Sequence, residues 1–231
     1  MDLPVGWTFL PGGAITVAHE CVTCKQVAVR RKYMPNAEVT LGFEGPYSWG
    51  GEEGTLSILD HDLAVTKKPG IYLWTILTDD GELIYYVGET GRSFSQRMHE
   101  HYKEHAAGAY HLNELTAFRR GDRVTVWEGL YGRGRSAFRQ ESVRRFCEFA
   151  QTIAALTEIY RFYLAPLECD ARLRQRIEAA IATHLYRQPG IIGHFQEEGI
   201  RYRGRTEQEA TIEIAVYSAV RLLGMPPCLL V

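Results

Sequence analysis

The stretch that most constrains the fold is "GIYLWTILTDDGELIYYVG", which covers residues 70–88. It consists of two apolar runs rich in aromatic and β-branched residues, and "TDDGE" between them is typical of a hairpin turn. The segment at residues 93–105 follows, with a serine at its start and with Phe94, Met98 and Tyr102 spaced by four. That spacing indicates an amphipathic helix with a serine cap. We therefore predict an antiparallel hairpin followed directly by a helix.

Further strands and helices are predicted downstream of this unit. Alternating or continuous apolar runs predict strands at residues 123–131 and 159–167. Apolar residues at helical spacing predict a long helix at residues 139–159 and another at 171–186, with Asp170 as the cap of the second.

Five polar side chains on these elements supply a candidate site. An arginine can clamp a phosphate, and one carboxylate can hold Mg²⁺, which keeps most of its waters. A tyrosine near such charges can activate a water molecule. These are the parts needed to hydrolyse a phosphodiester, although hairpin tyrosines more often serve only as packing residues. The five residues are Tyr72, Tyr86, Arg97, His101 and Glu178.

The wording and order of these residues resemble the GIY-YIG nuclease family. "GIY" is Gly70–Tyr72 and "YVG" is Tyr86–Gly88. The family has an arginine in its first helix, in several branches a histidine one turn later, and a metal-binding glutamate in a later helix. Arg97, His101 and Glu178 fit these three positions. The resemblance covers about residues 69–188 of the chain.

The resemblance implies an α+β fold, with a small antiparallel sheet flanked by helices and with N-terminal, internal and C-terminal additions. It also implies roles for the site. Tyr72 would activate water and Tyr86 would support or position it. Arg97 and His101 would meet the phosphate, and His101 could instead accept the proton of Tyr72. Glu178 would hold Mg²⁺, with Mn²⁺ tolerated in its place.

The expected activity is that of an endonuclease acting on double-stranded DNA, most like the stand-alone type II restriction enzymes of the family. A repair or mobile-element nuclease and a non-catalytic DNA-binding module on the same fold stay open as alternatives, and so does a homodimer. The expected division is a β-rich extension at residues 1–68, a nuclease core at 69–196 with an insertion at about 106–156, and a C-terminal extension at 197–231.

Two features depart from the family pattern. The family usually has an asparagine shortly after the metal glutamate, but the chain has only Asn36 and Asn113, and neither is placed for that role. His194 and Gln196 are the candidates to replace it. Glu89, directly after "YVG", also puts a negative charge where a phosphate must approach.

Basic residues cluster although the formal net charge of the chain is −2. Between residues 114 and 145 there are eight arginines against four acidic residues, which gives a locally positive segment. The alternative is a solvated charged surface without a ligand. The residues expected to reach DNA are Arg30, Arg31, Lys32, Arg119, Arg120, Arg133 and Arg135.

The cysteines favour a reducing compartment, because the chain has five of them and an odd number cannot all pair. His19, Cys21 and Cys24 lie close together, but a zinc site needs four ligands and no second pair of this spacing follows. We expect no secretory signal, no membrane span and a cytoplasmic location.

Overall fold

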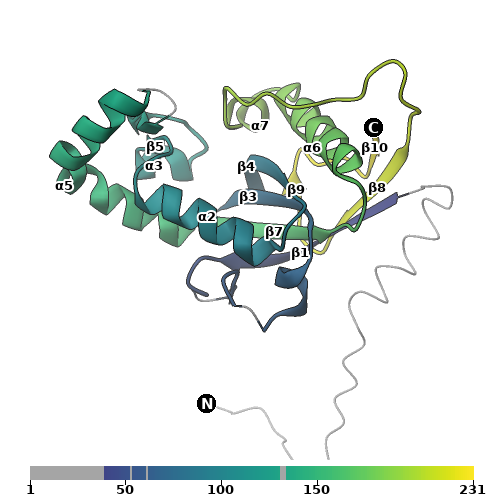
Figure 1. The fold of residues 1–231 in the computed structure, drawn as a ribbon, viewed down its shortest axis with the longest axis horizontal. Helices are drawn as coiled ribbons and strands as arrows, with labels where there is room; N and C mark the ends of the chain where they lie inside the picture. The colour runs from purple at the N-terminus through teal and green to yellow at the C-terminus, as the bar shows by residue number, and fades with distance from the viewer. Residues whose placement is uncertain (1–38, 53, 61, 131–133) are drawn as a thin grey trace, which may run out of the picture. The chain divides into compact units, whose positions relative to one another are not determined.

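The predicted hairpin is present as part of a larger sheet (Figure 1). β3 (Gly70–Thr78) and β4 (Gly81–Thr90) pair antiparallel, and β7 (Arg161–Pro166) pairs antiparallel with the other side of β3. This computed structural model describes residues 39–52, 54–60, 62–130 and 134–231, without the side chains of residues 135–137 and 139. All of them lie in one unit, which spans residues 36–231.

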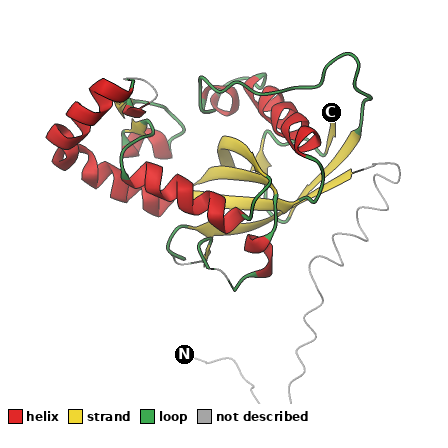
Figure 2. Ribbon diagram, viewed as in Figure 1, coloured by secondary structure: helices red, strands yellow, loops and turns green. Residues whose placement is uncertain are grey.

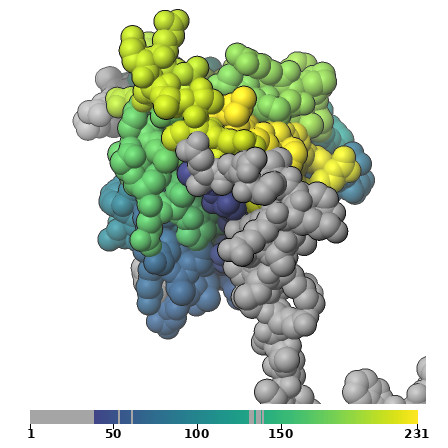
Figure 3. All heavy atoms as spheres, turned by 90° about the vertical axis from the view of Figure 1, so that its right-hand side faces the viewer, coloured from purple at the N-terminus to yellow at the C-terminus, as the bar shows by residue number. Residues whose placement is uncertain are grey.

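Strands from both ends of the described chain extend the same sheet. The strand order is β10-β8-β1-β7-β3-β4-β9, with β2 paired beside β1. The contacts of β1 with β8 and of β4 with β9 are parallel, so the sheet is mixed. The yellow C-terminal strands accordingly lie next to purple β1 in Figure 3. These strands are β1 (Val39–Ser48), β2 (Leu56–Ser57), β8 (Glu213–Ser218), β9 (Leu222–Leu223) and β10 (Cys228–Leu230).

The predicted helices are confirmed. α2 (Phe94–Ala106) begins after Ser93, whose hydroxyl accepts from the backbone N–H of Gln96. α6 (Ala171–Tyr186) begins after Asp170, which caps it in the same way. The long helix α5 (Arg135–Ile159) starts four residues before the predicted position. The short helices are η1 (Ala64–Lys67), α3 (Leu115–Arg119) and α7 (Ile191–His194).

The strand predicted at residues 123–131 is shorter than expected. Only β6 (Thr125–Trp127) is extended, and it pairs with β5 (Leu112–Asn113) in a separate two-stranded sheet. Gly129 ends the extended run, because its φ is +62° and a Cβ on it would lie 2.4 Å from the carbonyl oxygen of Ala109. The apolar pattern of residues 123–131 did not predict this turn.

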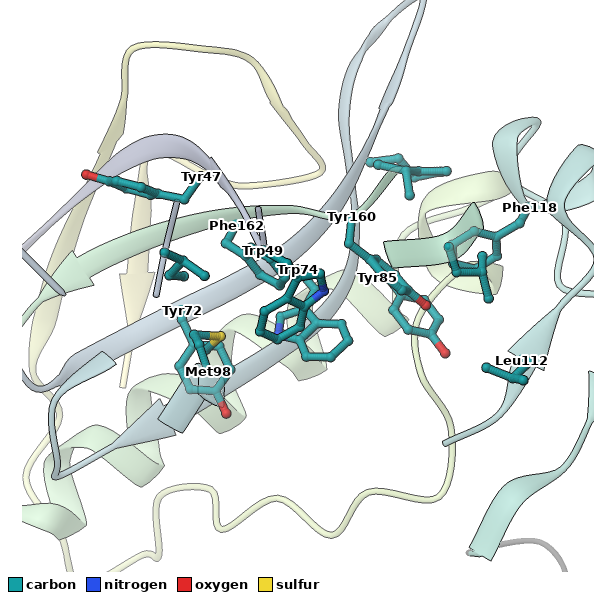
Figure 4. Packing of buried hydrophobic residues seen from close by; sticks show 14 of the residues in the cluster. Tyr47, Trp49, Tyr72, Trp74, Tyr85, Met98, Leu112, Phe118, Tyr160 and Phe162 are labelled. Atoms are coloured by element: carbon teal, nitrogen blue, oxygen red, sulfur yellow. The ribbon is translucent and has the colours of Figure 1, made fainter. Parts of the chain in front are cut away.

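Helices cover both faces of the central sheet (Figure 2). Alternate residues of β3 divide between two apolar clusters, since successive side chains of a strand point to opposite faces. Tyr72 and Trp74 pack in the first cluster with α2 and α5, as Figure 4 shows for Tyr72, Trp74 and Met98. Ile71 and Leu73 pack in the second cluster against α6. No helix in the described part of the chain is long and apolar enough to cross a membrane.

Candidate active site

Regular antiparallel pairing places Tyr72 and Tyr86 on the same face of the hairpin, and a β-bulge then adds Tyr85 to that face. Tyr72 pairs with Gly88 and Trp74 pairs with Tyr86, but Thr75 then pairs with Ile84. Tyr85 is therefore the extra residue of β4. As a result Tyr85 and Tyr86, although adjacent, both pack against the cluster that contains Tyr72. Bulges commonly redirect side chains beside active sites, and here the bulge turns Tyr85 toward the face that carries Tyr72. The rings of Tyr72 and Tyr86 lie at a centroid distance of 6.0 Å.

The glycines of both signatures are required by close approach of neighbouring atoms. A Cβ on Gly88 would lie 2.3 Å from Cζ and 2.4 Å from the hydroxyl oxygen of Tyr72. A Cβ on Gly70 would lie 2.2 Å from the carbonyl oxygen of Ala165 on β7. The ring of Tyr72 thus lies directly across the backbone of the second signature, in space that only glycine leaves open.

The Tyr72 hydroxyl is the centre of the site. Its side chain is fully buried, and its hydroxyl lies 2.8 Å from Nε2 of His101 and accepts a hydrogen bond from Nε of Arg97 at 3.3 Å. Burial raises the pKa of Tyr72 well above its usual value, and the neighbouring Tyr86 adds to this, whereas Arg97 opposes it. Tyr72 is therefore a neutral phenol at physiological pH, poised between a proton acceptor and a cation.

Arg97 is held in place from both sides. Its Nη1 donates to Glu100 at 3.2 Å, and Glu100 in turn accepts from Arg92 at 2.7 Å. Burial by itself would lower the pKa of Arg97, but the phenol of Tyr72 and the carboxylate of Glu100 outweigh burial and the pKa is raised. The guanidinium consequently keeps its charge in a half-buried position in the wall of a cavity, with its Nε and Nη1 already bonded to Tyr72 and Glu100.

Glu178 reaches the site from α6, on the other side of β4. Its carboxylate accepts a hydrogen bond from the backbone N–H of Glu89 at 3.1 Å. Burial and then the charge of Glu89 raise the pKa of Glu178 to about 7, while that hydrogen bond and Arg97 oppose the rise. The charge of Glu178 also raises the pKa of Tyr86, after the larger effect of burial. The structure therefore brings all five predicted residues to one end of β4.

Arg174 was not singled out from the sequence, and it changes the interpretation of Glu89. Its Nε donates to Oε2 of Glu89 at 3.0 Å, and its side chain is buried. Arg174 lies one helical turn before Glu178 on α6, so a single helix supplies both the carboxylate and the cation that pairs with Glu89. This ion pair partly offsets the negative charge of Glu89 beside the second signature, although that charge still raises the pKa of Glu178.

The two candidates for the missing asparagine occupy other positions. Gln196 is buried, and its Nε2 donates to the carbonyl oxygens of Ile84 at 2.7 Å and Ile192 at 3.0 Å. Both amide hydrogens are used in this way, so Gln196 links α7 to β4. His194 is exposed at the end of α7.

The carboxylate of Glu178 is a suitable ligand for a hard cation, although it does not belong to a larger group of potential metal ligands in the described residues. Within the described ranges no three His, Cys, Asp or Glu side chains are grouped to hold a metal, and no lysine or arginine forms an ion pair with Glu178 there. A divalent cation at this position would rest on one carboxylate and would complete its shell with water and substrate oxygens. That arrangement suits Mg²⁺, and its charge would offset the repulsion between Glu178 and Glu89.

A cavity of about 610 Å³ opens beside these residues. Tyr86, Arg97 and His101 form part of its wall, and Glu104 and Tyr110 continue it. Tyr110 comes from the segment predicted as an insertion, which therefore contributes directly to the surroundings of His101.

The predicted DNA-contacting residues are only partly covered by the structure. Arg119 and Arg120 are exposed at the end of α3. Arg30, Arg31, Lys32 and Arg133 lie outside the described residues, as do His19, Cys21 and Cys24, and the side chain of Arg135 is not described. The described cysteines Cys147, Cys169 and Cys228 are free thiols.

Comparison with known proteins agrees with this geometry. Residues 68–140 match the family model of the GIY-YIG catalytic domain, a range that contains the hairpin, α2 and the start of α5. Glu178 lies beyond the matched range. No curated protein and no solved structure matches the chain. The matched region therefore assigns a GIY-YIG nuclease fold to the part of the chain that carries Tyr72, Tyr86, Arg97 and His101.

Proposed function

We propose that the chain is a Mg²⁺-dependent endonuclease that hydrolyses phosphodiester bonds of double-stranded DNA. The observation that carries this proposal is the buried Tyr72 hydroxyl, held between Nε2 of His101 and Nε of Arg97. A phenol used only for packing needs one hydrogen-bond partner at most, whereas this one has a base on one side and a phosphate-binding cation on the other.

The chemistry follows from these contacts. Tyr72 takes a proton from the attacking water while it passes its own proton to His101, so the phenol does not have to be ionised beforehand. The water oxygen forms a bond to phosphorus and the bond to the leaving oxygen breaks. Arg97 stabilises the charge that develops on the phosphoryl oxygens. Tyr86 positions the water or the phosphate.

Glu178 is the residue that would hold the cation. When bound, Mg²⁺ supplies positive charge close to the leaving oxygen. The carboxylate must be ionised to bind a metal. Because its pKa is about 7, metal binding should become stronger as the pH rises through neutrality. Mn²⁺, which also prefers oxygen ligands, would serve in its place.

Within the nuclease class we favour a site-specific restriction endonuclease. A nuclease core that carries extra segments before, within and after it has material for base recognition, and Arg119 and Arg120 expose two cations that could contact phosphates. A repair-type nuclease would act on DNA structure instead of sequence. A non-catalytic DNA-binding module is the second candidate, and the missing asparagine is the observation that favours it.

One experiment separates these functions. A long DNA of mixed sequence is digested with the purified protein and Mg²⁺, and the ends are sequenced, with a parallel reaction in EDTA. We expect Mg²⁺-dependent cuts at one recurrent sequence. Cuts confined to branched or damaged DNA would indicate a repair enzyme, and binding without cuts under any metal would indicate the non-catalytic module.

Glu178→Gln provides the matched control, because it keeps the shape and the acceptor for the N–H of Glu89 but removes the charge. We expect this variant to lose cleavage while its DNA affinity stays within a few-fold of the parent. Cleavage at the parent rate by Glu178→Gln would remove Glu178 from the metal site.

A further inference from the structure

His101 has a second partner besides Tyr72. Its Nδ1 lies 2.7 Å from the hydroxyl of Tyr110, and that hydroxyl donates to Oε2 of Glu104, one turn further along α2. An unbroken row of hydrogen bonds therefore runs from Tyr72 through His101 and Tyr110 to Glu104. The first two groups are buried, whereas Tyr110 and Glu104 are half-buried and line the cavity.

The directions of these hydrogen bonds follow from counting protons. An ionised carboxylate only accepts, so the single hydroxyl proton of Tyr110 points to Glu104. Tyr110 must then accept from His101, which requires the proton of the imidazole to sit on Nδ1. A neutral imidazole carries one such proton, so Nε2 is left bare and accepts the O–H of Tyr72 at 2.8 Å.

The surroundings of His101 keep the ring neutral in this state. The ring packs at 5.2 Å from Trp74 and at 6.1 Å from Tyr86, measured between centroids, and Arg97 lies one turn before it on α2. Burial and the charge of Arg97 both lower the pKa of His101 well below its usual value. A carboxylate two hydrogen bonds away is then the nearest group on this row that can stabilise an added proton.

We propose that Tyr110 and Glu104 are positioning residues that fix His101 as its Nδ1–H tautomer and so make Nε2 the proton acceptor for Tyr72. This inference deepens the proposed nuclease function and rests on it for its kinetic consequence. When Nε2 takes the Tyr72 proton, the imidazolium donates its Nδ1–H toward Tyr110, whose hydroxyl remains bonded to the Glu104 carboxylate. The arrangement resembles a catalytic triad of acid, histidine and hydroxyl, in which Glu104 is the acid, His101 the histidine and Tyr72 the hydroxyl. It differs in that Tyr110 lies between the acid and the histidine.

The first test reads the tautomer directly and needs no cleavage. The protein is labelled with ¹⁵N-histidine, and the His101 signals are assigned by their loss in His101→Gln. We expect a protonated-type shift at Nδ1 and an unprotonated-type shift at Nε2. Tyr110→Phe, which keeps the ring and removes the hydroxyl that accepts from Nδ1, should abolish that preference. Tyr102→Phe is the matched control, since it removes an exposed hydroxyl next to His101 and should leave both shifts unchanged.

The second test is single-turnover DNA cleavage with Mg²⁺ at saturating enzyme. We expect Tyr110→Phe and Glu104→Gln to be slower by about tenfold or more, but less than the 10⁴-fold lost when a carboxylate that bonds the histidine directly is neutralised. Tyr102→Phe should cut at the parent rate. If Tyr110→Phe does not fold, Glu104→Gln carries the kinetic test.

The outcomes distinguish the two proposals. A parent His101 protonated on Nε2, or a Tyr110→Phe variant with unchanged His101 shifts, overturns the positioning role whatever the protein does to DNA. Folded variants that cut as fast as the parent overturn it as well. A parent with the expected tautomer that never cuts DNA would contradict the nuclease function alone.

Discussion

At the scale of single residues, the environment of Tyr72 sets how it can act. Full burial makes its anion unfavourable, and Arg97 offsets this only in part, so the pKa stays well above its usual value. A permanently ionised tyrosine is thereby excluded as the base at neutral pH. The contacts instead favour a phenol that takes up one proton while it releases another, for which a bare nitrogen at 2.8 Å is the necessary partner.

Gly88→Ala tests the close approach on which this geometry depends. The added Cβ would lie 2.3 Å from Cζ of Tyr72, so the ring must move away from its position between Arg97 and His101. Because a displacement of about 1 Å can cost 10²-fold in rate, we expect a loss of that order in single-turnover cleavage. The matched control is Gly204→Ala, whose Cβ would have no neighbour closer than 3.9 Å. Equal rates for both alanine variants would contradict the steric account.

At the scale of elements, α2 carries two buried histidines with different surroundings. His101 bonds to two tyrosine hydroxyls, whereas His105 is packed against Tyr160 and its Nε2 lies 3.3 Å from the backbone carbonyl of Ile153 on α5. Burial lowers the pKa of His105 to about 4, and its hydrogen bond to Ile153 opposes this. His105 thus joins α2 to α5, and its side chain also forms part of the cavity wall.

His105→Gln should reduce the pH dependence of stability. The folded-state pKa of His105 lies below the unfolded value of about 6.5, so the unfolded chain takes up the proton first and stability is lost as pH falls from about 6.5 toward 4. Between pH 7.5 and pH 5 this amounts to about 2 kcal/mol. Urea unfolding at both pH values should show a free energy of unfolding that falls by about that much less in the variant than in the parent.

The exposed His99 on the same helix provides the control for this measurement. His99→Gln should keep the pH dependence of the parent. If His105→Gln loses as much stability between the two pH values as the parent does, His105 does not contribute to the pH dependence of stability.

Elements were predictable from the sequence where local signals were strong. The hairpin at residues 70–90 has a turn between two β-rich runs, and α2 and α6 each have a capping side chain before an apolar period. The five candidate residues could be selected because their types and order along the chain resemble the GIY-YIG pattern, whereas their spacing alone would have left packing roles open. The bulge at Tyr85 and the shortening of strand β6 were not predicted, because both depend on close contacts with distant segments.

The residues that bond to Glu89 and His101 could also not be predicted from the sequence. Arg174 is far from Glu89 in the sequence, and Tyr110 is separated from His101 by the end of α2 and a turn. Nothing in the local sequence pattern distinguishes Arg174 or Tyr110 from ordinary surface residues. Their contacts exist only because α6 and the segment after α2 pack beside the hairpin. Interactions of this kind are tertiary, and spacing along a chain does not specify them.

At the scale of the whole described unit, one sheet joins segments from both sides of the matched region. β1 pairs with β7 and with β8, so residues 39–48 and 213–218 share the sheet that carries Tyr72. The described parts of the predicted N-terminal and C-terminal extensions therefore support the site structurally, whatever else they contact.

Binding to DNA should depend on salt through the exposed arginines of α3. Each phosphate contact releases counterions, so DNA affinity falls as the salt concentration rises. Replacing one contacting arginine should make the plot of log K against log salt less steep by about one unit. Arg119→Gln and Arg120→Gln should each show this reduction when DNA affinity is measured between low and moderate salt. An unchanged slope in both variants would mean that this part of the surface is only solvated.

The central claim is that the Tyr72 hydroxyl activates the water that cuts DNA. Tyr72→Phe keeps the ring and removes the hydroxyl. Nε2 of His101 and Nε of Arg97 then lose their hydrogen-bond partner, which should lower the free energy of unfolding by about 1–3 kcal/mol. The decisive measurement is single-turnover cleavage with Mg²⁺ at saturating enzyme, well below the unfolding temperature. The account predicts a loss of about 10²-fold or more for Tyr72→Phe, with a smaller loss for Tyr86→Phe. A Tyr72→Phe enzyme as fast as the parent would contradict it and leave His101 as the leading base.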